Sequence, residues 1–294
     1  MKLSNFCIFI AAGCRREAVA IRAATFACLL GAALPVAAQT AITPDLTVRQ
    51  FFCTFANSPT DCGFQVQEAV PGRASTVNVG RDGGTAVRLH TEPGDSGPVV
   101  YTTGMERNDV LLSQADTDGY EGHEAWWAHS IMLPDDFAYP TWQMYVLMDF
   151  HNSTGPWQAN FHINFAPDPA NPDLPGILIF RGYGGLNNSD GQYTAPIGPV
   201  AKNVWYDFVY HVRWSSGPDG FFDAWVNGVQ KLHHVGPTLY AGQGVYLKLA
   251  NYHTPVCNPY PGCTGPASSV IHDRILRGTT WQSVSLTTLE GVLP

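Results

Sequence analysis

Positive charge is scarce in this sequence. The 294 residues include 16 Lys and Arg against 24 Asp and Glu, which gives a formal net charge of −8. A surface that follows the phosphates of a nucleic acid needs the opposite balance, so we expect no nucleic-acid partner. Charged residues of both signs make up only 14% of the chain and hydrophobic residues 45%, and this composition excludes an intrinsically disordered protein.

Long apolar runs are missing as well. The main apolar stretch, residues 23–34, is shorter than the roughly 20 residues that a membrane-spanning helix needs. Small side chains in residues 35–38 suit cleavage after Ala38, and four basic residues precede the apolar stretch: Lys2, Arg15, Arg16 and Arg22. We therefore predict that residues 1–38 are a secretory signal peptide, with a membrane anchor as the alternative. The mature protein is then expected to be secreted or periplasmic and to have no membrane partner.

The predicted cleavage makes the protein more acidic. Residues 1–38 contain four basic residues and one acidic residue, so residues 39–294 keep 12 basic and 23 acidic residues and a net charge of −11. An anionic ligand must then be held by a few local cations against a repulsive overall field.

The Cys-x-x-Cys spacing that is typical of zinc sites is absent from the predicted mature chain. Three of the seven cysteines fall within residues 1–38, and an even number remains: Cys53, Cys62, Cys257 and Cys263. In an exported protein, such a set favours disulfides. Of the three connectivities, we predict the local pairs Cys53–Cys62 and Cys257–Cys263, and we predict no metal site.

No segment shows a sustained helical period of apolar residues. Short runs of strand character recur instead, and they cover residues 85–90, 126–133, 142–151, 161–165, 177–181, 205–214, 221–226 and 244–252. Asn227-Gly228 is a strong hairpin signal, and 29 glycines and 22 prolines supply further turns. The pattern predicts an all-β sandwich or jelly roll. No repeat or linker divides residues 39–294, which we take as one domain.

Complete motifs of three hydrolase classes are also absent. Ser96 lies in a Gly-Asp-Ser-Gly-Pro segment, but only His90 precedes it in the predicted mature chain, and the chain order of chymotrypsin-like proteases needs both partners before the serine. His123-Glu124 and His129 lack the H-E-x-x-H spacing of zinc peptidases. The E-x-D-x-x-E strand of jelly-roll glucanases is missing, which weakens a prediction of glycoside hydrolysis without excluding it.

One loop has a partial calcium motif. Residues 116–121 resemble the start of a calcium-binding loop but lack the full ligand set. We expect no required cofactor and keep structural calcium as an alternative.

Three short segments carry side chains suited to binding and acid–base chemistry. Residues two apart in a strand share a face, which groups Arg107 with Asp109 and Asp149 with His151. The same spacing groups four residues of the segment 246–252: Tyr246, Lys248, Ala250 and Tyr252. The alternative for these segments is an ordinary surface, with an ion pair, a turn histidine and an exposed sheet face.

Longer motifs resemble those of one enzyme family. Residues 126–137 and 205–214 resemble the W-x-x-x-S-I-x-L-P-x-D-F and W-Y-D-F-V-x-H-V-x-W strands of heparinase I-like and glucuronan lyase-like polysaccharide lyases. Residues 219–228 resemble the hairpin that follows these strands. Residues 246–252 are similar to Y-x-K-x-G-x-Y, a pattern also found in jelly-roll alginate lyases, and residues 272–275 fit the closing strand.

The resemblance implies a fold, a reaction and a set of site residues. The fold is a concanavalin A-like β-jelly-roll, and the reaction is cleavage of uronic-acid polysaccharides by β-elimination. The family's R-x-E segment maps onto Arg107 and Asp109. Its Q-x-H strand maps onto Asp149 and His151, and its final tyrosine maps onto Tyr252.

The sequence departs from the family pattern at three of its positions. Asp149 replaces the glutamine, and Ala250 and His253 replace a glycine and an arginine near the tyrosine. A carboxylate at Asp149 would repel a uronate unless it is protonated or paired with Arg107 or Lys248. This substitution suggests one alternative, a non-catalytic carbohydrate-binding protein on the same fold.

The chemistry of β-elimination explains the residue types. The proton next to a uronate carboxylate becomes acidic once that carboxylate is neutralised, and Arg107, Lys248 or the amide of Asn164 could do this. A base then removes the proton, and an acid protonates the leaving oxygen. Tyr252 can do both when proton and leaving group lie on the same side of the sugar. When they lie on opposite sides, His151 is the candidate base and Tyr252 the acid.

The combined prediction is a secreted, monomeric polysaccharide lyase whose partner is an acidic polysaccharide. Tyr246 is a further candidate for contacting the substrate. A glucuronan- or alginate-like uronan fits better than densely sulfated heparin, because the chain has few cations. A lectin-like binding protein and a glycoside hydrolase that uses Asp109 and Asp149 are the alternatives.

Overall fold

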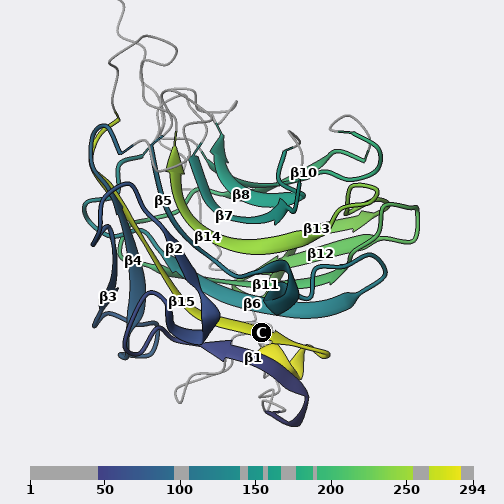
Figure 1. Cartoon of the computed structure of the whole chain (residues 1–294), viewed down its shortest axis with the longest axis horizontal. Helices are drawn as coiled ribbons and strands as arrows, with labels where there is room; N and C mark the ends of the chain where they lie inside the picture. The colour runs from purple at the N-terminus through teal and green to yellow at the C-terminus, as the bar shows by residue number, and fades with distance from the viewer. Residues whose placement is uncertain are drawn as a thin grey trace, which may run out of the picture. The chain divides into compact units, whose positions relative to one another are not determined.

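The computed structural model describes residues 46–95, 106–139, 145–154, 158–166, 177–187, 191–253 and 265–285. These residues form two antiparallel sheets that pack face to face (Figure 1). The architecture confirms the predicted all-β jelly-roll sandwich. The predicted signal peptide and the predicted Cys257–Cys263 pair lie outside the described residues.

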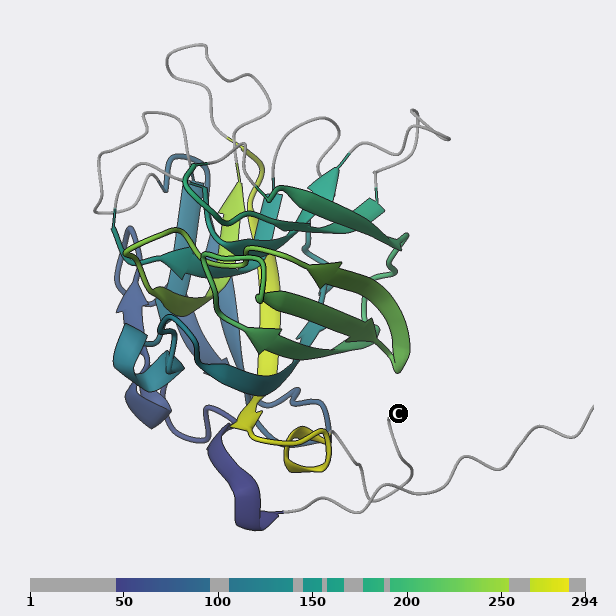
Figure 2. The same cartoon turned by 90° about the vertical axis from the view of Figure 1, so that its right-hand side faces the viewer.

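The larger sheet has eight strands. Its order is β13 (Val229–Val235), β12 (Phe221–Val226), β11 (Trp205–Arg213), β6 (Glu124–Met132), β15 (Ser268–Gly278), β4 (Ala86–Thr91) and β3 (Ala74–Val77), with β1 (Arg49–Cys53) paired to β15. Strands from the two ends of the chain therefore lie side by side, and Figure 2 shows β1 (purple) next to the end of β15 (yellow).

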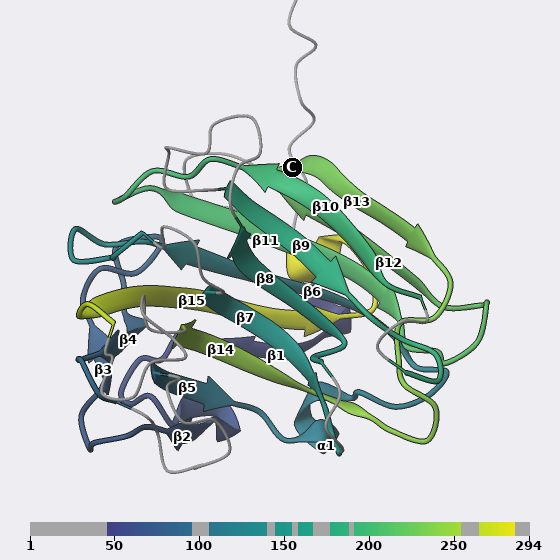
Figure 3. The same cartoon turned by 90° about the horizontal axis from the view of Figure 1, so that it is seen from above.

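The smaller sheet has seven strands. Its order is β10 (Tyr193–Gly198), β9 (Ile177–Gly182), β8 (Phe161–Ala166), β7 (Tyr145–Asn152), β14 (Val245–His253), β5 (Glu106–Leu111) and β2 (Gln65–Gln67). Figure 3 shows these strands from above. The described helical segments are short: α1 (Gln114–Thr117), η1 (Leu46–Val48), η2 (Asp61–Gly63) and η3 (Gln282–Val284).

Aromatic side chains fill the space between the sheets. Phe150 of β7 makes an edge contact with Trp127 of β6, and Phe161 of β8 stacks on Phe222 of β12 with ring centroids 4.0 Å apart. All four side chains are buried, and burying such a side chain contributes about 1.5–3 kcal/mol. In the seven-stranded sheet, every second side chain along a strand therefore packs in the core, and the alternate side chains lie on the other face of the sheet.

A disulfide between Cys53 and Cys62 joins the end of β1 to η2, with the two Cα atoms 5.9 Å apart. This confirms one of the two predicted pairs. Within the part of the chain that the structure describes, no helix is both long and apolar enough to cross a membrane.

Candidate active site

The three predicted segments meet on adjacent strands of the seven-stranded sheet. The central strand, β14, pairs with β5 on one side and with β7 on the other. Across these pairs Tyr252 lies opposite Arg107, and Lys248 lies opposite Asp149. Opposed residues of antiparallel strands point to the same face of a sheet. Here it is the face of the seven-stranded sheet that is turned away from the core. Figure 1 shows β14 and β7 curving around it.

Asp109 of β5 binds both nearby cations through one oxygen. Its Oδ2 accepts from Arg107 Nε at 2.9 Å and from Arg107 Nη2, and it lies 3.2 Å from Lys248 Nζ. The Asp109 and Lys248 side chains are 1% and 4% exposed. Burial lowers the pKa of Arg107, but the charge and hydrogen bond of Asp109, together with Asp149 and Tyr252, raise the pKa overall. The guanidinium therefore stays charged.

Arg107 connects this ion cluster to the predicted catalytic tyrosine. Its Cζ lies 5.0 Å from the centroid of the Tyr252 ring, which is cation–π geometry. Its Nη2 also donates to Gln67 Oε1 of β2 at 2.7 Å. The sequence did not point to Gln67, because β2 is only three residues long and shows no clear alternation.

Asp149 is not paired with the cations. It is 7% exposed, and no ion pair within 4.0 Å joins it to Arg107 or Lys248. Its Oδ1 has no hydrogen-bond partner among the described residues. Burial raises the pKa of Asp149, and the nearby His151 and Lys248 offset only part of that effect. Of the two ways to avoid repelling a uronate, protonation is therefore the one that the structure favours.

His151 and Tyr246 form a second group on this face. Their rings lie 5.2 Å apart. His151 Nδ1 lies 2.9 Å from the backbone carbonyl oxygen of Asn152, and because a carbonyl only accepts, Nδ1 carries the proton and Nε2 is left as the basic nitrogen. Burial and then Asp149 raise the pKa of Tyr246, so its phenol stays neutral.

The two groups are separated along the sheet. His151 lies opposite Tyr246, and Tyr252 lies six residues further along β14. At about 3.3 Å per residue, the backbones of Tyr246 and Tyr252 are roughly 20 Å apart. The structure therefore brings Tyr252 to Arg107 and His151 to Tyr246, but it does not place His151 beside Tyr252.

The polar face continues onto β8 and β9. His162 lies opposite Asp149, and Arg181 lies opposite His162. Asn164 is on the same strand as His162, is 2% exposed, and donates through Nδ2 to the Phe165 carbonyl at 3.0 Å. Sequence reasoning selected Asn164 but missed His162, although the strict alternation of residues 161–165 places both on one face.

His253, at the position where the family often has arginine, is on the other face of β14. It is 3% exposed, and its ring lies 4.8 Å from that of Tyr145, in the interior. Its Nε2 is 3.1 Å from Thr91 Oγ1. His253 therefore cannot take the place of an arginine beside Tyr252.

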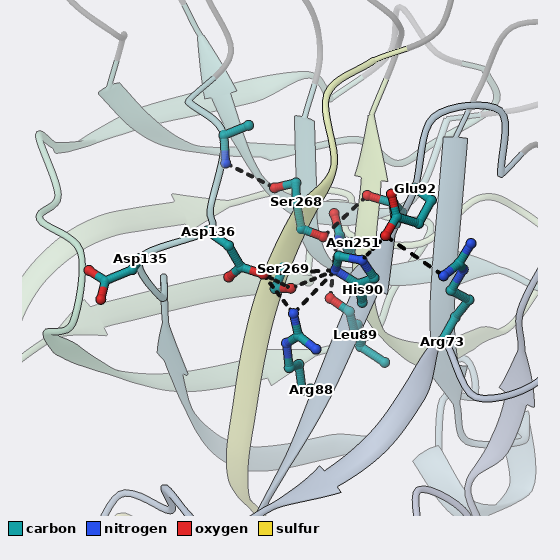
Figure 4. A network of polar contacts seen from close by, with 12 residues as sticks. Arg73, Arg88, Leu89, His90, Glu92, Asp135, Asp136, Asn251, Ser268 and Ser269 are labelled. Carbon is teal, nitrogen blue, oxygen red and sulfur yellow. Dashed lines mark hydrogen bonds and ion pairs between the residues drawn. The ribbon is translucent and has the colours of Figure 1, made fainter.

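A second polar network lies on the eight-stranded sheet and has a different role (Figure 4). Ser269 Oγ is 2.9 Å from His90 Nδ1, and His90 Nε2 donates to Glu92 Oε1 at 2.9 Å. The order resembles a nucleophilic triad, but Ser269 is fully buried and its hydroxyl donates to Asp136 Oδ2 at 2.8 Å. A serine that no substrate reaches is not a nucleophile, so this network stabilises the contact of β4 and β15 with the loop at Asp136.

The residues of the partial calcium motif have partners in the protein. Asp116 Oδ2 accepts from Ser113 Oγ at 2.6 Å, and Asp118 Oδ1 lies 2.8 Å from His123 Nδ1. In the described segments, no group of three His, Cys, Asp or Glu side chains is arranged to hold a metal ion.

Comparisons with known proteins identify the fold and the family of the chain. No curated protein sequence matches the chain. The crystal structure of endo-β-1,4-glucuronan lyase from the fungus Trichoderma reesei is similar in fold, with a TM-score of 0.59 and 18% identity over 80% of this chain and 98% of that chain. The structure of alginate lyase Aly36B gives a TM-score of 0.49 and 14% identity over 77% of this chain and 93% of that chain. The sequence model of the polysaccharide lyases matches residues 62–275, more than half of the chain, and the protein belongs to this polysaccharide lyase family.

Proposed function

We propose that this polysaccharide lyase is exported and cleaves a uronic-acid polysaccharide, glucuronan- or alginate-like, by β-elimination. The observation that carries the proposal is that Arg107 contacts both the ring of Tyr252 and the carboxylate of Asp109, which also binds Lys248, on one face of the seven-stranded sheet. This arrangement supplies a phenol with a guanidinium over its ring and a second basic side chain on the same face, and these are groups that the reaction needs for proton transfer and for charge neutralisation.

Neutralising the substrate carboxylate is the first requirement. In β-elimination the carbon next to that carboxylate loses a proton, and negative charge spreads onto the carboxyl oxygens. Arg107 and Lys248 hold positive charge on this face, and Asp109 fixes both of them. Preorganised cations stabilise the enolate-like intermediate without having to reorient.

Tyr252 is the proposed base and acid. As phenolate it takes the proton next to the carboxylate, and as phenol it donates a proton to the departing glycosidic oxygen, so it ends in the state in which it began. The guanidinium of Arg107 faces its ring. A base on His151 and an acid on Tyr252 would have to reach one sugar from backbone positions roughly 20 Å apart, and this spacing favours the single-tyrosine route.

The remaining predicted residues are proposed to bind the polymer. His151 and Tyr246 contact a neighbouring sugar, and Asn164 contacts the substrate from β8. The proposed reaction needs no cofactor, and the proposed working form is an exported monomer. Hydrolysis through Asp109 and Asp149 is disfavoured, because Asp109 is tied to two cations and its side chain is 1% exposed.

The test is ultraviolet absorbance of the mature protein with glucuronan, alginate, pectate, hyaluronan and heparin, because elimination creates an absorbing double bond. We expect absorbance to rise on a uronan and the Tyr252→Phe variant to lose at least about 100-fold in rate. Tyr206→Phe, on the eight-stranded sheet, is the matched control and keeps the rate.

Other outcomes would point to other functions. Reducing ends without absorbance would show a hydrolase. Retarded migration through a polysaccharide gel without any product would show a binding protein. Full activity in Tyr252→Phe would contradict the assignment of the tyrosine.

A further inference from the structure

One row of residues crosses the strands of the site and takes no part in the proposed proton transfers. In the strand register, Asp149 of β7 lies opposite His162 of β8, and His162 lies opposite Arg181 of β9. On the other side of β7, Asp149 lies opposite Lys248 of β14 in the strand register. All four side chains share the site face, since directly opposed residues of antiparallel strands point the same way. The row thus crosses four strands and extends the site from β14 to β9, away from Tyr252.

Three polar atoms of this row are buried without a hydrogen-bond partner among the described residues. They are Asp149 Oδ1, His162 Nε2 and Arg181 Nε. Asp149 is 7% exposed and His162 3% exposed. Buried polar atoms are paired in native proteins with few exceptions, so three of them in one row indicate a polar ligand that supplies the missing partners.

The groups around Asp149 determine its charge. They are Lys248 and Tyr246 on β14, Arg107 and Asp109 on β5, His151 on its own strand, and His162 on β8. Both cations of this set contact Oδ2 of Asp109, and neither forms an ion pair within 4.0 Å with Asp149. His162 does not supply a charge either, because burial and then Arg181 lower its pKa to about 3.

We infer that Asp149 acts as a neutral carboxylic acid that donates its O–H to the carboxylate of a bound uronate, with Arg181 and His162 completing the subsite. The inference rests on the proposed uronan lyase function. A protonated aspartic acid can donate, as the amide of the family's glutamine can, whereas an ionised one can only accept. Its hydrogen bond to a carboxylate is short and charge-assisted, and the proton stays on Asp149 throughout.

A pH dependence follows from this assignment. Burial raises the pKa of Asp149, so the acid form persists above the range of an ordinary aspartate. When the pH passes that pKa, Asp149 loses its proton, stops donating and repels the uronate. The kcat/KM of the enzyme for uronan then falls about tenfold per pH unit on the alkaline side.

The experiment compares the pH profile of kcat/KM for the wild type and for Asp149→Asn. The asparagine keeps the size and the donor but cannot ionise. We expect it to remain active, to lack the alkaline fall and to exceed the wild type at high pH. Asp273→Asn is the matched control, because burial also raises the pKa of Asp273, to about 7, but on the eight-stranded sheet. This control keeps the alkaline fall.

A second measurement does not depend on activity. The infrared spectrum of the wild type minus that of Asp149→Asn should show the carbonyl stretch of a protonated carboxylic acid at neutral pH, and its absence would overturn the inference. A folded but inactive Asp149→Asn, or an unchanged alkaline fall in that variant, would also overturn it while the proposed function stands. A wild type that cleaves no uronan would instead overturn the proposed function, and this inference with it.

Discussion

Asp109 binds two cations through a single oxygen. Its Oδ2 contacts Arg107 and Lys248, and its Oδ1 has no hydrogen-bond partner among the described residues. Removing one partner from a buried ion pair leaves the other charge uncompensated, which costs more than the pair itself contributes. The arrangement therefore makes the stability of the fold and the charge of the site depend on the same carboxylate.

We predict that Asp109→Ala lowers the free energy of unfolding by about 3–5 kcal/mol, because Arg107 and Lys248 lose their carboxylate. Adding Lys248→Met to this variant should recover part of the loss, since it removes one of the unpaired charges. Urea unfolding of the three proteins measures both effects. A loss below about 1 kcal/mol in Asp109→Ala would mean that solvent, not Asp109, compensates these cations.

Some features of the site were predicted from the sequence and others were not. The spacing of residues in the sequence shows which side chains share a face of one strand, but not which contacts join two strands. Alternation placed Lys248 and Tyr252 on one face of a strand, and the structure agrees. It could not show that Arg107 and Lys248 share Asp109, because that contact joins two strands more than a hundred residues apart. The protonation of Asp149 depends on burial, which no local pattern reveals.

Strand β15 has an irregularity beside Asp273, another carboxyl group with a raised pKa. Its register with β6 shifts between Asp273 and Leu276, and Arg274 takes a positive φ of 55°. The kink turns Asp273 toward two backbone donors, Arg81 N at 2.7 Å and Arg274 N at 2.6 Å. Burial nevertheless raises the pKa of Asp273 to about 7, because these hydrogen bonds offset only part of the desolvation.

This pKa predicts a stability that falls as the pH rises. Between about pH 4 and pH 7 the folded state keeps the proton on Asp273, whereas the unfolded state has lost it, so the stabilisation is complete below pH 4 and lost through pH 7. The shift corresponds to at most about 4 kcal/mol. Asp273→Asn should flatten this slope in thermal unfolding measured across the range.

Below about pH 4, where Asp273 of the wild type keeps its proton in both the folded and the unfolded state, the same variant should be less stable than the wild type. Its amide has one oxygen for two N–H donors, and leaving one donor unpaired costs about 1–3 kcal/mol. An unchanged slope in Asp273→Asn would assign the pH dependence to another group.

The strands that the sequence predicted well are those with clear turn residues at their ends. Runs at residues 205–214 and 221–226 match β11 and β12 closely, because both are bordered by turn residues and alternate cleanly. The short strands β2 and β3 were not predicted, since three or four residues give too few periods to read. Strand β13 was not predicted either, because most of its residues are exposed and polar.

Over the whole molecule, acidic residues outnumber basic ones, and the proposed substrate has the same sign. The chain carries a net charge of −8, and its predicted mature form −11. Long-range repulsion then opposes the approach of a polyanion, while the local cations of the site attract it at short range. Salt separates these two effects, because screening weakens the interaction of distant exposed charges first.

We predict that kcat/KM on a long uronan rises severalfold as the ionic strength increases from about 10 mM to about 150 mM, because the Debye length shrinks from about 30 Å to about 8 Å. The buried contacts of Arg107 and Lys248 with Asp109 are screened much less and keep the site intact. A uronan oligosaccharide that fills only the site should show a smaller rise, since fewer of its charges meet the rest of the surface. Steady-state kinetics on both substrates tests this. A rate that falls with salt from the lowest concentration would show instead that local positive charge steers the polymer into the site despite the net charge of the protein.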